Sequence, residues 1–164
     1  APSAGFSQGW GFLVLAEPAD RDRFWSATSP TDAAPSSWLD GMRRAPLIVV
    51  ALSNRSVYLD RYAEQDKGWT DRDEARWPVP YWDVDAGMAA LLVLLTAVDE
   101  GLGACLFGIP AERVDPFRDA FGIPGTHRPV GCLSVGYPGD GDRRSPSLRR
   151  GRRGLDEVVH RGRW

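Results

Sequence analysis

The sequence predicts an α+β fold in which a mostly antiparallel sheet is flanked by helices, within one domain over residues 1–164. The first observation is the segment 86–98, where Thr96 is the only polar side chain. This segment is shorter than the roughly 20 residues that cross a bilayer, and a helix that is apolar all round is buried on all sides. The second observation is a set of short apolar runs before and after it, which are typical of buried strands.

The first half of the chain begins with turn-prone residues at 1–10, followed by an uninterrupted apolar strand, GFLVL, at 11–15. Residues 46–52, PLIVVAL, form the clearest strand, because the run is β-branched and unbroken, and we expect it at the centre of the sheet. The other elements expected here are a helix at 19–26, a loop at 28–37, a short helix at 38–43, a weak helix at 54–63 and a long polar loop at 64–80.

The second half follows from the central helix, which ends where Asp99 and Glu100 precede a glycine stop, GLG, at 101–103. One face of this helix can pack on the chain's own sheet, but the other face needs a second cover. The same helix from a second copy, related by a two-fold axis, is the simplest cover, so a homodimer is expected. The later elements are a strand at 104–107, an amphipathic helix at 110–121 and a closing strand at 128–135.

The end of the chain differs in composition from the rest. Residues 139–154 contain no core-forming side chain except Leu148. The last ten residues are too apolar for a solvated end, because they include Leu155, Val158, Val159 and Trp164. We therefore expect a core over 1–138 and a C-terminal arm over 139–164 that packs on another surface.

Composition and charge exclude several classes of function. A net charge of −2 argues against nucleic acid as the main partner, although eight of the 20 basic residues lie in the last 22 positions. Cys105 and Cys132 each lie in an apolar run, as expected for reduced, buried thiols in a cytoplasmic protein. With His127 and His160 they show no metal-ligand spacing, so no metal is expected. No membrane span or signal peptide is expected either.

Five stretches resemble the FMN-dependent nitroreductase family, in the family's own order along nearly the whole chain. APSAGFSQGWGFLVL is similar to the family's APSxxNxQPWxFxVV segment, and RAPLIVVAL is similar to its second strand. DVDAGMAALLVLLTAVDEGLGACLFG resembles its interface helix and the strand after it. FGIPGTHRPVGCLSVGYP resembles the end of its sheet, and RRGRRGLDEVVHRGRW its basic C-terminal arm.

The resemblance implies a nitroreductase-like sandwich whose C-terminal arm is exchanged between the subunits of a homodimer, with two FMN sites at the interface. NADH or NADPH would reduce the flavin by two electrons in ping-pong order. A nitroaromatic, a quinone or a similar flat acceptor would then take those electrons. Because the cofactor carries the hard step, no catalytic side chain is expected from the protein.

Residue by residue, the resemblance also implies cofactor contacts. Ser3 matches the serine that approaches the flavin, and Gln8 matches the glutamine of QPW. Gly108 and Ile109 match the pair at a strand end whose backbone lies near the reactive edge of the ring.

The phosphate of FMN requires arginine forks or a helix N-terminus. Arg150 and Arg152 match the family's basic pair on that phosphate, whereas a charge run alone would indicate a solvated tail. Phe6 and Gly9 stand where the family has asparagine and proline. The family's preceding RRSxRxF segment, which also holds the phosphate, has no counterpart here. Either the sequence is a fragment of a longer chain or the site is weakened.

Four aromatic residues lie in the long loop and at the start of the central helix: Trp69, Trp77, Tyr81 and Trp82. They can roof the flavin and stack on a flat substrate, or they can pack the loop onto the dimer. Asp85 follows them and is either a first-turn charge that matches the helix dipole or a site residue.

Two other functions are weighed against a flavin oxidoreductase. A flavin-binding or storage protein of the same fold, with little turnover, is motivated by Phe6 and by the missing front segment. Steady NAD(P)H consumption with a quinone separates it from an enzyme. A nucleic-acid module acting through the Arg-rich arm lacks a basic folded face with interleaved aromatics. Salt-sensitive DNA binding by the body without the arm would favour that reading.

Overall fold

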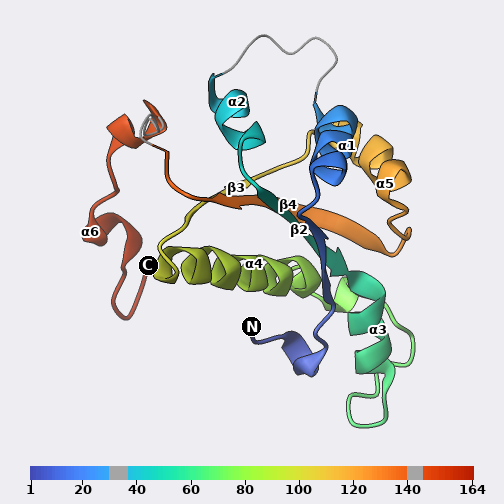
Figure 1. Ribbon diagram of the computed structural model, residues 1–164. Coiled ribbons are helices and arrows are strands. Elements are labelled where there is room, and N and C mark those ends of the chain that lie inside the picture. The colour runs from blue at the N-terminus through green and yellow to red at the C-terminus, as the bar shows by residue number, and fades with distance from the viewer. Residues whose placement is uncertain (30–36, 140–145) are drawn as a thin grey trace.

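The computed structural model describes residues 1–29, 37–139 and 146–164 (Figure 1). Within these residues, four strands form one antiparallel sheet in the order β1-β2-β4-β3, and helices flank it, as the α+β prediction requires. The strands are β1 (Trp10–Leu15), β2 (Leu47–Asn54), β3 (Gly103–Phe107) and β4 (His127–Gly136). β2 lies between β1 and β4, which confirms that its β-branched run belongs to the middle of the sheet.

Successive side chains of β2 point into two separate cores, because side chains alternate between the faces of a strand. On one face, Ile48, Val50 and Leu52 pack with α1 (Pro18–Thr28), α2 (Ser37–Arg43) and α5 (Val114–Phe121). On the other face, Val49 and Ala51 pack with α4 (Tyr81–Asp99). Figure 1 shows α4 crossing this side of the sheet, with α3 beside its N-terminal end. Among the described residues, α1, α2 and α5 thus pack on one face of the sheet and α4 packs on the other.

The sheet-facing side of α4 is lined with small residues, including the buried Ala90 and Ala97. Its outer side carries large apolar residues that are 47–69% exposed: Leu91, Leu92, Leu95 and Val98. The helix has 19 residues and is long and apolar enough to cross a membrane by length and composition alone, a test that a helix packed on a sheet also passes. Within the part of the chain that the structure describes, this outer face is thus about half exposed, and it is the face for which a second copy is expected.

Some element boundaries agree with those the sequence predicts, such as the helix expected at 54–63, and others differ. α3 (Arg55–Ala63) begins directly after β2, because the Asn54 side chain accepts the backbone N–H of Ser56 at 3.0 Å and caps the helix. The helix expected at 110–121 is shorter, since η3 (Ala111–Arg113) is a 3₁₀ turn and α5 starts only afterwards. The long polar loop at 64–80 contains one 3₁₀ turn, η2 (Glu74–Arg76).

The described residues of the C-terminal arm form only short elements, η4 (Pro146–Arg150) and α6 (Leu155–Val158). Its apolar side chains are 48–97% exposed: Leu155, Val158, Val159 and Trp164. Residues 140–145 of the arm and residues 30–36 of the loop expected at 28–37 lie outside the described residues.

Candidate functional site

Ser3 and Gln8 are brought together by a tight turn before β1. η1 (Ala4–Phe6) is a 3₁₀ turn, and the Gln8 backbone N–H donates to the Ser3 hydroxyl oxygen at 3.0 Å. Gly5, Phe6 and Gln8 all have positive φ, between 53° and 61°. The Ser3 hydroxyl oxygen is thereby fixed in place, while its own proton stays available to another acceptor.

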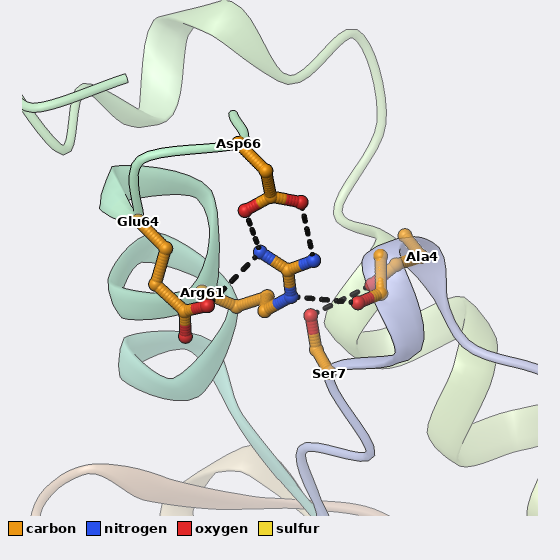
Figure 2. Close-up of polar contacts among 6 residues, drawn as sticks. Ala4, Ser7, Arg61, Glu64 and Asp66 are labelled. Carbon is orange, nitrogen blue, oxygen red and sulfur yellow. Dashed lines mark hydrogen bonds and ion pairs between the residues drawn. The ribbon is translucent and has the colours of Figure 1, made fainter. Parts of the chain in front are cut away.

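Two side chains from distant parts of the chain contact this turn. The Ala4 N–H donates to Asp85 Oδ2 at 2.8 Å, and Arg61 Nε donates to the Gly5 carbonyl oxygen at 2.9 Å. Figure 2 shows the Arg61 guanidinium between the turn and the carboxylate of Asp66. Tyr58 also donates to Asp85 Oδ2, at 2.8 Å. The turn is therefore attached to both α3 and α4.

Gly108 and Ile109 follow β3, at the opposite edge of the sheet from the turn. The register directs both segments toward the same end of the sheet, because Trp10 lies opposite Ser53 and β3 ends with Phe107 opposite Cys132. β3 stops short of that end, since β4 begins at His127. A Cβ built on Gly108 meets no atom within 4 Å, so its backbone faces open space. The Ile109 side chain packs against the core shared with α1 and α5.

Arg150 and Arg152 are exposed and lie in the arm that leaves the other end of the sheet. β4 ends at Gly136 opposite Gly103, the first residue of β3, so the arm departs from the end remote from Gly108. Figure 1 shows the arm on that side, near the C-terminal end of α4. One chain therefore does not bring the arginines to the strand end.

The four predicted substrate aromatics are brought together, and Trp77 lies at their centre. Its ring centroid is 5.6 Å from Trp69, and 5.9 Å from both Tyr81 and Trp82. Tyr62 of α3 packs on it at 4.5 Å. Trp82 is 8% exposed, whereas Tyr81 is 37% exposed and is the most open of these rings at the start of α4. The cluster thus packs the loop onto α3 and α4, and Tyr81 marks its accessible side.

Asp83 and Asp85 have separate partners although both lie in the first turns of α4. Asp83 accepts Ser53 Oγ and Arg128 Nη2, each at 2.6 Å, and it lines a cavity of about 360 Å³ between α3, α4 and the start of β4. Asp85 is 2% exposed and points to the turn. Of the two readings of Asp85, a dipole charge or a site residue, the contacts with the turn favour the second.

Sequence reasoning does not identify Tyr58 and Arg61 as site residues. Both lie in a segment that shows only a weak helical pattern, and their partners are far away in the chain. Burial, followed by the hydrogen bond to Asp85, raises the pKa of Tyr58 well above its usual range. The hydrogen bond between Arg61 and Asp66 raises the pKa of the guanidinium and lowers the pKa of the carboxyl group.

The remaining polar candidates have structural partners. His127 contacts Thr126 and Asn54, and His160 stacks on Trp164 with ring centroids 4.0 Å apart. Cys105 and Cys132 are free thiols. Among the described residues, no group of three or more His, Cys, Asp or Glu side chains could hold a metal ion. A second cavity of about 580 Å³ lies between α1 and α2 and contains none of the predicted site residues.

Comparisons with known proteins agree with this architecture. The nitroreductase family model matches residues 1–137. A proposed NADH dehydrogenase/NAD(P)H nitroreductase of Archaeoglobus fulgidus is 29% identical over 142 residues, which are 85% of this chain and 67% of that protein. The structure of a Clostridium difficile nitroreductase family protein has a TM-score of 0.66 at 20% identity and covers all of this chain and 80% of its own. A Streptococcus pneumoniae nitroreductase family protein has a TM-score of 0.69 at 19% identity, with 98% and 82% covered.

Proposed function

The chain belongs to the nitroreductase family, and from that premise we propose that it is an FMN-dependent oxidoreductase. It passes two electrons from NADH or NADPH to a nitroaromatic, a quinone or a similar flat acceptor, in ping-pong order. The observation that best supports this proposal is the open space beside the backbone of Gly108, which follows an edge strand. A Cβ there would meet no atom within 4 Å. A flat ring can approach such a backbone closely.

The residues present fit FMN in two parts. Toward the same end of the sheet but at opposite edges, Gly108 and Ile109 offer backbone groups and the turn offers the hydroxyl of Ser3 and the side chain of Gln8. At the other end, Arg150 and Arg152 offer guanidinium forks, which match phosphate in charge and geometry. When bound, FMN supplies the hydride chemistry, and the protein supplies orientation and a site sheltered from water. Trp69, Trp77, Tyr81 and Trp82 would bound the substrate side.

The separation of these two parts supports a homodimer in which the C-terminal arm is exchanged. A second copy can place its arm beside the strand end that the first chain's own arm does not reach. The exposed leucines of α4, Leu91, Leu92 and Leu95, are a suitable interface, because burying apolar area drives association. The exposed apolar side chains of α6 and of the residues after it would also be stabilised by burial against another surface. We propose that the partner subunit covers both surfaces, and that the dimer works in the cytoplasm.

Spectroscopy and steady-state kinetics test the proposal. The purified protein, or the protein reconstituted with FMN, should show the visible absorbance of an oxidised flavin. That absorbance should bleach on addition of NADH or NADPH under nitrogen and return on addition of a quinone. A colourless protein that cannot be reconstituted would refute the proposed cofactor.

A storage protein of the same fold is the second candidate, and Phe6 is the observation that favours it. Phe6 stands where the family has asparagine, and its side chain is 76% exposed. The turn therefore presents an apolar ring where a polar contact with the flavin would otherwise be made. A protein that binds FMN but consumes NAD(P)H no faster with a quinone than free FMN does would be a storage protein.

A further inference from the structure

The turn over residues 3–8 has a backbone conformation that its sequence disfavours. The φ angle is 61° at Gly5, 57° at Phe6 and 53° at Gln8, all in the left-handed region. Glycine adopts this region freely, but residues with a Cβ do so at a cost. The exposed ring of Phe6 does not offset that cost by packing. Contacts from outside the turn must therefore stabilise it.

The first such contact is with Asp85 of α4. Its Oδ2 atom accepts both the Ala4 N–H and the Tyr58 hydroxyl, each at 2.8 Å. A buried carboxyl group requires hydrogen-bond donors, and the turn supplies one of the two. Tyr58 keeps its proton because burial raises its pKa, so it remains a donor to Asp85. The N-terminal side of the turn is thus fixed to the start of α4.

The second contact is with Arg61 of α3. Its Nε donates to the Gly5 carbonyl oxygen at 2.9 Å, while Nη1 and Nη2 each pair with an oxygen of Asp66 at 2.7 Å (Figure 2). A bidentate pair of this kind fixes the plane of the guanidinium. Asp66 thereby aims the Nε–H of Arg61 at the turn.

Two aromatic rings of α3 lie directly beneath the same turn. A Cβ on Gly5 would lie 2.6 Å from Tyr62 Cε2, and a Cβ on Gly9 would lie 2.5 Å from Tyr58 Cε2. Both glycines are therefore required by close approach to α3. The rings of Tyr62 and Tyr58 thus pack against Gly5 and Gly9, while Asp85 and Arg61 bind two backbone groups of the turn.

We propose that Asp85 and Arg61 are positioning residues that lock this turn, so that Ser3 and Gln8 meet the flavin in one fixed arrangement. The inference rests on the proposed function. A turn that is already ordered loses little conformational freedom on binding, which favours affinity. Because Asp85 lies in α4, the lock also joins the cofactor turn to the helix whose outer face is the proposed subunit interface.

The test compares Asp85→Ala and Arg61→Ala with two matched controls. Asp83→Ala removes a carboxyl group from the same part of α4, where it binds Ser53 and Arg128 instead of the turn. Arg72→Ala removes an arginine that pairs with Asp60 of α3 at 2.6 Å. Amide hydrogen exchange of the FMN-free protein reports on the turn, and titration with FMN reports on the affinity.

We expect the amides of Phe6, Ser7 and Gln8 to exchange roughly tenfold faster in both turn variants, the effect of losing one ordinary hydrogen bond. The amides of β2 and β4 should be unchanged, and the FMN dissociation constant should rise by a similar factor. Asp85→Asn should recover most of the loss, because its amide oxygen can accept the Ala4 N–H. Ser3→Ala should weaken FMN binding less in the Asp85→Ala background than in the wild type, because Ser3 contributes fully only while Asp85 positions the turn.

Normal exchange in the turn of both variants would overturn the proposal, and so would a loosened turn that binds FMN as tightly as before. Equal effects of Asp83→Ala would also overturn it. Should Asp85→Ala fail to fold, Arg61→Ala decides alone. A wild-type protein that binds no FMN would refute the proposed function instead, and the exchange data would still show whether the lock exists.

Discussion

Tyr58 and Asp85 form a buried hydrogen bond of 2.8 Å between α3 and α4. Tyr58 is fully buried, and Asp85 is 2% exposed. The bond connects the helix that follows the central strand to the helix that carries the exposed leucines. It also supports the carboxyl group that holds the turn before β1. A single side-chain contact thus links the sheet, the candidate cofactor turn and the proposed interface.

Replacing Tyr58 by Phe should lower the free energy of unfolding by about 1–3 kcal/mol, because Asp85 would lose one of its two donors while staying buried. Urea unfolding at neutral pH measures the change. Tyr62→Phe is the matched control on the same helix, since no side-chain hydrogen bond links Tyr62 to Asp85. A similar loss in both variants would contradict the assigned role of the Tyr58 hydroxyl.

The same variant gives a pH dependence whose sign follows from the raised pKa of Tyr58. In the unfolded chain the phenol ionises near its ordinary value of 10.0, whereas in the folded protein it stays protonated to higher pH. Its contribution to stability is therefore complete below pH 10 and falls as the pH rises above that value. The stability difference between wild type and Tyr58→Phe should shrink in urea titrations between pH 9 and 11. A difference that grows over this range would refute the sign.

The fold could be predicted from the sequence largely because its main signals are local. The unbroken run of β2 and the apolar stretch of α4 are each read from neighbouring residues. The lock on the turn could not be predicted in this way, because the Ala4–Asp85 bond spans 81 residues and the Arg61–Gly5 bond spans 56. The pairing of Ser3 with Gln8 spans only five residues, yet it occurs with positive φ angles at Phe6 and Gln8, which residues with a Cβ disfavour.

The role of the C-terminal arm could not be predicted from local sequence signals for a different reason. Arg150 and Arg152 can be matched to a phosphate only by resemblance, because one chain does not bring them to Gly108. The aromatic cluster could be predicted from the sequence in part. The sequence places four rings close together, but only the fold shows that Trp77 contacts the other three and that Tyr81 lies at the open side.

Gly108→Val should lower FMN affinity without lowering stability. The position is free of steric contact, and its φ is not in the left-handed region, so the fold accepts a side chain there. A valine would nevertheless separate a flat ring from the backbone. FMN titration and thermal unfolding measure the two effects. Gly136→Val is the opposite control, because its Cβ would lie 2.7 Å from Cδ of the rigid Pro46 ring and should destabilise the sheet. If Gly108→Val has a much lower unfolding temperature while the remaining folded protein binds FMN normally, the site lies elsewhere.

Leu92→Asp and Leu95→Asp should convert the proposed dimer to monomers and release FMN with it. An unpaired charge in an apolar interface costs several kcal/mol, while in a monomer both side chains are already about half exposed. Light scattering gives the mass and absorbance gives the flavin content. Trp38→Asp is the control for the mass alone, because Trp38 is 52% exposed on α2, on the other side of the sheet, while its ring also packs on Phe107 next to Gly108. Variants that remain dimeric would show that the outer face of α4 is not the interface.

The arm should be needed for both the dimer and the cofactor, but through different residues. Full burial of Leu155, Val158, Val159 and Trp164 would contribute on the order of 1.5–3 kcal/mol each as an upper estimate. Deleting everything after Gly139 should therefore weaken the dimer and FMN retention together.

The double substitution Arg150→Ala with Arg152→Ala should weaken FMN retention alone, because both side chains are exposed and contribute charge and not apolar area. Since screening by salt weakens exposed charge contacts, high salt should reduce FMN retention in the wild type more than in the double variant. Arg161→Ala with Arg163→Ala removes the same charge from the end of the arm and controls for a general effect. A truncated protein that stays dimeric and keeps its full flavin would show that the arm takes no part in the site.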